Sequence, residues 1–322
     1  MHRIIALVGP TAGGKSAIAV ELAQLLNAEI VSCDSMQVYR HMPVLTQAPT
    51  AGQRSQVPHH LIDCMEPTEL FSVGRYRRMA DAAMEQILAR DKRVLLVGGT
   101  GLYLRAIGQG LCEAPAADPR IREELWNEVK DTSSAALHHR LQGVDLVAAA
   151  RIHPNDARRI VRALEVYALT GKPLSAWWQQ TSCGCAQPMT IVGIQRDRIA
   201  LNARIRRRLL EMVYEQAVIH EARLLLRLPL SSTVRQVHGL ADLERYLTGT
   251  ATLKETLAIW EQRVRQYARR QLIWFRRTPG LQWVNVPENE NPWETASRII
   301  ELIRMLPTMP VVGGAEPSDA LR

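Results

Sequence analysis

The string Gly9-Pro-Thr-Ala-Gly-Gly-Lys15-Ser16 stands between an apolar run at residues 3–8 and a segment at 16–26 whose apolar residues recur at helical spacing. It fits the phosphate-loop pattern G-x-x-x-x-G-K-[ST], and it lies where that loop is needed, between a strand and a helix. Backbone N–H groups of such a loop surround phosphate oxygens, and the helix N-terminus adds positive potential. Lys15 is expected to reach the terminal phosphate, and Ser16 is a candidate Mg2+ ligand. The predicted phosphate-binding residues are Gly9, Thr11, Ala12, Gly13, Gly14, Lys15 and Ser16.

Further apolar runs predict a parallel sheet around this loop. A second run at 28–33 follows the first helix, a third at 93–97 follows a helical segment at 74–89, and a further strand is expected at 190–194. Strand, helix, strand is the unit of a parallel α/β sheet. We therefore predict an α/β fold with a P-loop NTPase-like parallel sheet as its core.

An all-helical subdomain is expected to interrupt this core, because the apolar spacing at 118–178 is helical and shows no strand pattern. After it, long helices are expected at 201–228 and 254–277. The predicted division is a discontinuous catalytic core at 1–113 and 187–304, a helical insertion at 114–186, and a loose tail at 305–322.

Composition limits the class of protein. The chain has 322 residues and a formal net charge of +8, and 35 of its 40 basic residues are arginines. It has no run long enough to span a membrane and no secretory signal at its first residues, so we expect a cytoplasmic protein without a membrane partner. Five scattered cysteines favour reduced thiols, and the close pair Cys183 and Cys185 lacks the partners of a zinc site. The basic balance suggests a polyanionic partner, but it is mild, and arginine richness alone does not identify one.

Polar residues follow the predicted strands at the edge that carries the phosphate loop. Asp34 follows the second strand, where a carboxylate suits Mg2+ binding or general-base catalysis, or else caps the next helix. Asp63 is a rival that equally suits a turn. Thr100 follows the third strand and is either a hydroxyl facing the phosphates or a turn residue. His59 and His60 are adjacent, so in extended chain they point to opposite sides and are not expected to bind one ion together.

Arginines gather in three helical segments. Guanidinium groups bind phosphates bidentately and stack on bases, so clusters beside aromatic residues suit RNA, although any one cluster equally suits a solvated helix face. The clusters are Arg196, Arg198, Arg204, Arg206, Arg207 and Arg208; Arg263, Arg265, Arg269, Arg270, Arg276 and Arg277; and Arg158, Arg159 and Arg162.

The phosphate loop alone leaves several reactions open. A GTPase would need the guanine-reading string N-K-x-D and a D-x-x-G after a strand, and the sequence contains neither. A nucleotide or nucleoside kinase remains an alternative, although it has no obvious need for three arginine clusters.

Seven ordered strings resemble the tRNA dimethylallyltransferase (tRNA isopentenyltransferase) family over about residues 4–277. They are GPTAGGKS from Gly9, Asp34-Ser-Met-Gln-Val-Tyr-Arg40, Val57-Pro-His-His-Leu-Ile-Asp63, Gly98-Gly-Thr-Gly-Leu-Tyr103, Asp118-Pro-Arg-Ile-Arg122, Asn155-Asp-Ala-Arg-Arg-Ile-Val-Arg-Ala-Leu-Glu165 and Tyr267-Ala-Arg-Arg-Gln-Leu-Ile-Trp-Phe-Arg276.

The resemblance implies an Mg2+-dependent transferase acting on tRNA, and we expect it to be a monomer. It implies transfer of a dimethylallyl group from dimethylallyl diphosphate to the exocyclic amine of adenine 37, next to an adenine at 36 in the anticodon arm, with release of diphosphate. In this family the phosphate loop holds a diphosphate rather than a nucleotide. The alternatives are the kinase and a tRNA-binding relative that has lost catalysis.

The resemblance also implies residue roles. Asp34 would be the base, Thr100 would hydrogen-bond near the scissile oxygen, and Lys15, Arg204 and Arg208 would bind the diphosphate beside Ser16 and its Mg2+. The implied tRNA-contacting residues are Asp34, Ser35, Met36, Gln37, Arg122, Arg158, Arg159, Arg162, Arg269, Arg270, Trp274 and Arg276.

Three stretches depart from the family pattern. Where the family usually has I-G-T-A-K-P-T, this chain has Val44-Leu-Thr-Gln-Ala-Pro-Thr50, so Ala48 replaces a lysine. A G-Y-[KR] element corresponds to Gly239-Leu240-Ala241, and Ala217-Val218 replaces a common Gly-Leu. We therefore expect an active enzyme with weakened RNA affinity or altered tRNA choice.

Overall fold

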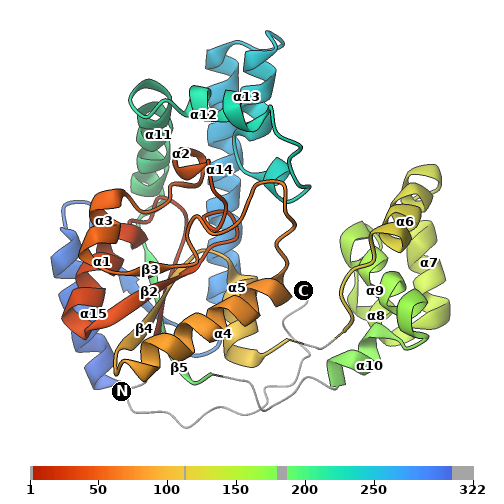
Figure 1. The fold of residues 1–322 in the computed structure, drawn as a ribbon, viewed down its shortest axis with the longest axis horizontal. Coiled ribbons are helices and arrows are strands. Elements are labelled where there is room, and N and C mark those ends of the chain that lie inside the picture. Colours follow the sequence, from red (N-terminus) through yellow and green to blue (C-terminus); the bar gives the residue numbers. More distant parts are fainter. Residues whose placement is uncertain (1–2, 112–113, 180–186, 307–322) are drawn as a thin grey trace. The chain divides into compact units, whose positions relative to one another are not determined.

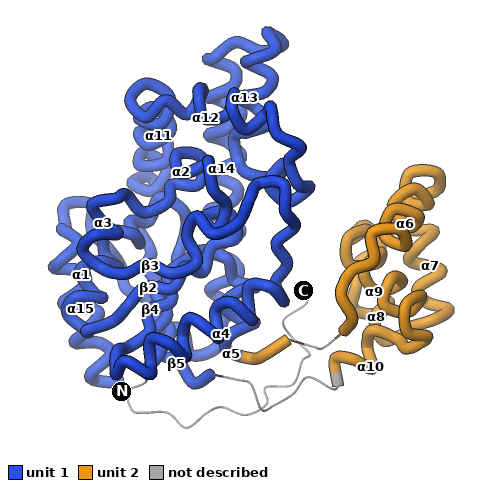
Figure 2. Tube along the Cα trace, viewed as in Figure 1, with its two compact units in different colours: residues 1–108, 187–311 blue, residues 109–186, 312–322 orange. Residues whose placement is uncertain are grey.

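The computed structural model describes residues 3–111, 114–179 and 187–306, which fall into two compact units. The first unit contains the described residues up to 108 and those from 187 onward, and the second contains the described residues of 109–186 (Figure 2). The second unit begins at residue 109, before the 114 expected from sequence. Of the tail expected at 305–322, all but the first two residues lie outside the described residues.

The first unit is built on a six-stranded parallel sheet with the order β3-β2-β4-β1-β5-β6. The strands are β1 Ile4–Val8, β2 Ala28–Cys33, β3 His59–His60, β4 Arg93–Gly98, β5 Met189–Gln195 and β6 Gln282–Asn285. The α/β prediction and its four long strands are confirmed. The two short strands at the sheet's edges, β3 and β6, were not predicted.

Helices cover both faces of the sheet (Figure 1). The first unit's helices are α1 Lys15–Leu26, α2 Pro43–Thr46, α3 Ala51–Gln56, α4 Val73–Ala89, α5 Gly101–Gln109, α11 Arg198–Tyr214, α12 Val218–Leu225, α13 Leu240–Leu247, α14 Leu253–Arg276 and α15 Pro292–Met305, with a 3-10 turn at Val234–Gln236.

Alternation along β1 explains why the strand is apolar throughout. Ile5 and Leu7 pack into the cluster formed with α1 and α15, whereas Ile4, Ala6 and Val8 pack into the cluster formed with α4 and α5. Every residue of β1 is therefore buried, as expected for a parallel strand covered on both faces.

The predicted long helix at 201–228 is wrong as a single element. The structure has two helices, α11 and α12, separated by a left-handed residue, Ala217, with φ of 55°. A left-handed backbone turns the chain out of the helical path, so α12 starts in a new direction. The helix expected at 254–277 is present as α14.

The second unit is helical in its described part. Its helices are α6 Pro119–Asp131, α7 Ser134–Val144, α8 Leu146–Arg151, α9 Ala157–Thr170 and α10 Leu174–Gln179. Asp118 caps α6 and Asp156 caps α9, each by accepting hydrogen bonds from backbone N–H groups of the first turn. A separate apolar cluster, with Leu137, Leu141 and Ile160 fully buried, forms this unit's own core.

Candidate active site at the phosphate loop

The phosphate loop connects β1 to α1 and presents free backbone N–H groups at the start of that helix. Gly14 has φ of 99° and occupies the N-cap position of α1, where no side chain of the described residues caps the helix. A side chain would strain this left-handed residue, and a capping oxygen would occupy the N–H groups. The loop therefore leaves an anion site at the N-terminus of a 12-residue helix.

Lys15 lies across the loop. Its Nζ donates hydrogen bonds to the carbonyl oxygens of Gly9 at 2.9 Å and Pro10 at 2.8 Å. Burial lowers its pKa to about 8, with Asp34 opposing and Arg208 reinforcing that change. The ammonium is thus poorly solvated, and a bound anion would stabilise its charge.

Three arginines converge on the same loop. Arg196 Nε donates to the Gly13 carbonyl at 2.9 Å, Arg204 Nε donates to the Ala12 carbonyl at 3.0 Å, and Arg208 Nη1 lies 3.5 Å from Thr11 Oγ1. Burial lowers the pKa of all three, that of Arg208 to about 10. Desolvated cations around one loop favour binding of a polyphosphate, because its negative charge stabilises guanidinium groups that water no longer solvates. Arg196 belongs to a cluster seen in the sequence but was not predicted as a site residue.

Asp34 follows β2 and keeps one carboxylate oxygen available. Its Oδ1 accepts hydrogen bonds from the backbone N–H groups of Met36 at 2.9 Å and Gln37 at 3.4 Å. Its Oδ2 makes no hydrogen bond with any residue that the structure describes. Capping of the following segment and general-base catalysis were the alternative roles of Asp34 in the sequence. The geometry is compatible with both, because Oδ1 caps the turn and Oδ2 is available.

Thr100 and Asp34 meet because β2 and β4 are neighbours. Cys33 pairs with Gly98 at the ends of these strands, and Thr100 Oγ1 accepts a hydrogen bond from Ser35 N at 3.2 Å. A Cβ on Gly98 would lie 2.0 Å from the Cys33 carbonyl oxygen, so only glycine permits this approach. Asp63, the other acidic candidate from the sequence, instead forms an ion pair with Arg54 at 2.7 Å.

Gln271 joins the phosphate loop to the turn after β4, and it was not predicted as a site residue. Its Oε1 accepts a hydrogen bond from Thr11 N at 2.8 Å, and its Nε2 donates to the Gly99 carbonyl at 3.0 Å. The side chain is 5% exposed and comes from α14, far away in sequence. Its position within the quoted string at 267–276 was the available signal.

The predicted tRNA contacts of the first unit lie on two segments. Ser35, Met36 and Gln37 are half-buried in the turn that Asp34 begins, whereas Arg269, Arg270 and Arg276 are exposed on α14. Trp274, on the same helix, packs against α5: a Cβ on Gly101 would come within 2.0 Å of its indole nitrogen, and the Arg105 guanidinium lies 5.7 Å from its ring centre.

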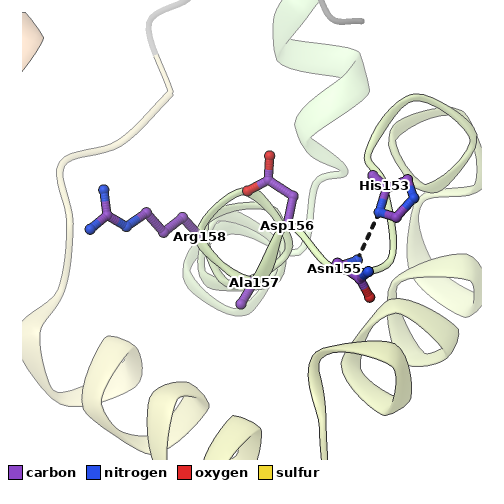
Figure 3. A pocket seen from close by; sticks show the side chains of 5 residues that line it. All are labelled: His153, Asn155, Asp156, Ala157 and Arg158. Carbon is purple, nitrogen blue, oxygen red and sulfur yellow. Dashed lines mark hydrogen bonds between the residues drawn. The ribbon is translucent and has the colours of Figure 1, made fainter. Parts of the chain in front are cut away.

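The predicted tRNA contacts of the second unit are partly engaged in ion pairs. Arg122 and Arg162 each pair at 2.7 Å with Glu165, which is completely buried. Arg159 pairs with Asp156 at 3.4 Å. Arg158 lines a shallow hollow of about 450 Å³ with His153, Asn155, Asp156 and Ala157 (Figure 3).

One departure from the family pattern, Leu240, is accounted for by packing. Leu240 is 1% exposed, and Gly239 has φ of 97° where a Cβ would lie 2.2 Å from Trp260. The His238 ring lies 4.6 Å from the ring of Tyr267, and burial together with Arg270 and Arg263 lowers the pKa of His238. Leu240 is therefore part of the apolar core, whereas Ala241, which stands where the family pattern has a basic residue, is exposed.

A metal ion at this edge would depend on the anion. Among the described residues no group of three or more His, Cys, Asp or Glu side chains could hold one. Ser16, in the first turn of α1, makes no hydrogen bond through its hydroxyl to the described residues, so its oxygen is available. One hydroxyl suits Mg2+ only where phosphate oxygens and water complete the shell. His59 and His60 are engaged elsewhere, with the Val57 carbonyl and Glu29 respectively.

Among the described residues no helix is long and apolar enough to cross a membrane.

The sequence is similar to one family of known proteins along most of its length. A family profile described as IPP transferase matches residues 37–278, and one described as isopentenyl transferase matches residues 2–62. A tRNA dimethylallyltransferase from Geobacter metallireducens is 43% identical over 289 residues, which are 88% of this chain and 93% of that protein. One from Carboxydothermus hydrogenoformans is 40% identical over 285 residues, covering 88% of this chain and 91% of that one.

Solved structures agree. A tRNA isopentenylpyrophosphate transferase from Bacillus halodurans superposes with a TM-score of 0.69 at 36% identity, covering 94% of this chain and 96% of that one. A eukaryotic dimethylallyltransferase, described as acting on tRNA, superposes with a TM-score of 0.82 at 25% identity, covering 95% of this chain and 81% of that one.

Proposed function

The chain belongs to the IPP transferase family, and we propose that it transfers a dimethylallyl group from dimethylallyl diphosphate to the exocyclic amine of tRNA adenine 37 at the loop edge formed by Lys15, Asp34 and Thr100. The observation that carries the assignment of this site is the convergence of Arg196, Arg204 and Arg208 with Lys15 on a loop that also adjoins a carboxylate.

The cations account for the leaving group. As the bond between the first prenyl carbon and the bridging oxygen breaks, its electron pair goes to the diphosphate. Lys15 and Arg208 are desolvated and close to the loop, so they stabilise the added charge strongly. Arg204 holds the loop carbonyl of Ala12 through Nε, which leaves its other N–H groups for the anion.

Asp34 accounts for the proton. The adenine amine attacks the first prenyl carbon and forms the new C–N bond, and the extra proton on that nitrogen passes to the Asp34 carboxylate. An adenine amine is a weak nucleophile, so removing the proton during attack lowers the barrier. Oδ1 is engaged with the backbone of the following turn, so Oδ2 is the oxygen that receives the proton.

Thr100 supports both partners. Its Oγ1 accepts from Ser35 N, which fixes the start of the turn after Asp34 and leaves the hydroxyl proton for a substrate oxygen. Donation to the bridging oxygen would assist its departure.

Mg2+ is the proposed cofactor, held by Ser16 together with diphosphate oxygens. When bound, it would neutralise part of the charge on the departing diphosphate.

Exposed arginines of the first unit are the proposed contacts for the RNA partner. Arg269, Arg270 and Arg276 on α14 are candidates for phosphate contacts, and Ser35 to Gln37 for contacts near the target base. An adenine within a stacked anticodon arm has to leave its stack to reach the loop edge.

A transfer assay tests the assignment. The purified protein is incubated with radiolabelled dimethylallyl diphosphate, Mg2+ and unmodified tRNA with adenines at 36 and 37, and we expect label in the RNA. The matched control is the same tRNA with guanine at 37, which is expected to stay unlabelled. Binding of the adenine tRNA without labelling would contradict the proposal and indicate a relative without catalysis. Phosphate transfer from ATP to a nucleoside would instead indicate a kinase.

A further inference from the structure

We propose that Gln47 is a positioning residue that holds the Arg208 guanidinium against the diphosphate site, an inference that rests on the proposed role of Arg208.

The amide of Gln47 is held in one orientation. Its Oε1 accepts a 2.6 Å hydrogen bond from Arg208 Nε, while its Nε2 donates to the Val44 carbonyl at 2.9 Å and lies 3.4 Å from Gln216 Oε1. Since the Nε2 side faces two acceptors, turning the amide over would place oxygen against oxygen. The acceptor is therefore fixed toward the guanidinium.

Arg208 depends on this acceptor. It is half-buried, and its hydrogen bonds among the described residues are those from Nε to Gln47 and from Nη1 to Thr11 Oγ1, the latter at 3.5 Å. The bond from Nε leaves Nη1 near the loop, at Thr11, and leaves the other terminal N–H groups for an anion. Without this bond, the flexible side chain lets the guanidinium adopt other orientations. Bidentate binding of the diphosphate needs one fixed orientation, so the contact weakens.

The two neighbouring arginines are held differently. Arg196 and Arg204 use Nε to bind main-chain carbonyls of the loop, Gly13 and Ala12. Only for Arg208, among these three, does a side chain serve as the Nε acceptor, so a substitution can remove it.

Gln47 is itself held by a rigid frame. It ends α2 with φ of 52°, and Glu221 caps the start of α2 by accepting from Val44 N at 2.9 Å and Leu45 N at 2.7 Å. The Gln47 carbonyl also accepts from Gln37 Nε2 at 3.1 Å, and Gln37 N donates to Asp34 Oδ1. The segment that ends at Gln47 therefore fixes both Arg208, on the diphosphate side, and the turn that follows Asp34, the proposed general base.

The test measures pyrophosphate binding by calorimetry together with steady-state transfer. We expect Gln47→Ala to weaken pyrophosphate binding about 5- to 20-fold and to raise KM for dimethylallyl diphosphate, with KM for tRNA unchanged, because one charged hydrogen bond is lost. Gln47→Asn, which tolerates the left-handed backbone but is one methylene shorter, is expected to act in the same direction. The glutamine control is Gln53→Ala, which lies in the capping box of α3 and should leave pyrophosphate binding unchanged.

A double-mutant cycle separates positioning from structure. In the background Arg208→Lys, Gln47→Ala should have less than a 2-fold further effect on pyrophosphate binding, because its action passes through the guanidinium. A full effect in that background, or a wild-type affinity of Gln47→Ala with its fold intact, overturns the inference. If Arg208→Ala also binds pyrophosphate normally, the proposed role of Arg208 fails as well. If Arg208→Ala alone is weakened, only the inference about Gln47 fails.

Discussion

At the residue scale, Gln271 shows how one side chain assembles a site from distant segments. Its amide satisfies Thr11 N in the phosphate loop and the Gly99 carbonyl in the turn before Thr100. Both backbone groups lack another partner within the described residues. A buried backbone group left without a partner is costly, so this glutamine fixes the distance between the two loops.

Gln271→Leu is expected to lower the free energy of unfolding by roughly 2–4 kcal/mol, since two backbone groups lose their partners. Urea unfolding measures this. The control is Gln266→Leu, an exposed glutamine on the same helix, which should change stability by less than about 0.5 kcal/mol. Equal stabilities for the two variants would contradict the bridging role.

Lys15 predicts a pH dependence of anion binding. Its pKa is lowered to about 8 in the free protein, and a bound diphosphate would raise it again. Above about pH 8 the free amine is increasingly neutral, so pyrophosphate binding should weaken as pH rises through this range and should take up a proton.

Calorimetry in buffers of different ionisation enthalpy, at pH 8 to 9, reports that proton. Pyrophosphate titrates as well, so the informative quantity is the difference from Lys15→Arg, whose guanidinium stays charged. Identical proton uptake by the two proteins would show that Lys15 is already charged in the free state.

At the element scale, the break between α11 and α12 could not be predicted from local signals. The sequence there contains neither glycine nor proline, and apolar spacing continues on both sides. The left-handed conformation of Ala217 is imposed by packing of the two helices, with Val213 and Val218 both buried.

Ala217→Gly is expected to stabilise the protein by up to about 1 kcal/mol. Glycine removes the strain of a left-handed alanine, and this gain exceeds the loss from a more flexible unfolded chain. Thermal or urea unfolding measures the change, with Ala222→Gly within α12 as a control that should destabilise. A less stable Ala217→Gly variant would contradict the assignment of strain.

The sequence was sufficient for elements with long periodic patterns and for the strand-end residues that the parallel sheet brings together. It was not sufficient for β6, because a strand of four residues has too short a pattern. The helix α15 was also not predicted, although Asn291, Pro292 and Glu294 form a helix start signal. Gln271 and Gln47 were missed as site residues because their partners lie in segments that only the tertiary fold brings close.

At the scale of the whole molecule, the 35 arginines fall into structural and surface-exposed groups. Some neutralise buried carboxylates: Arg122 and Arg162 pair with Glu165, and Arg263 pairs at 2.7 Å with Asp242, which is 2% exposed. Others, such as Arg269, are exposed and form no ion pair within the described residues. A count of basic residues therefore overstates the surface available to RNA.

Arg269→Ala should weaken tRNA binding about 3- to 10-fold and reduce the salt dependence of log Kd by about one unit of slope, as expected when one phosphate contact is lost. The control is Arg265→Ala on the same helix, whose guanidinium pairs with Glu261. Filter binding at several salt concentrations gives both slopes. An unchanged slope for Arg269→Ala would remove this residue from the RNA-binding surface.

The division of the site into a diphosphate side and a base side is tested most directly by Asp34→Asn. The asparagine oxygen can still accept the bonds from Met36 N and Gln37 N, so the turn is preserved while the base is lost. In a single-turnover assay with labelled dimethylallyl diphosphate, we predict that prenyl transfer to tRNA falls about 10²- to 10⁴-fold, with tRNA and pyrophosphate binding within about 3-fold of wild type. Transfer at the wild-type rate by Asp34→Asn would contradict the account.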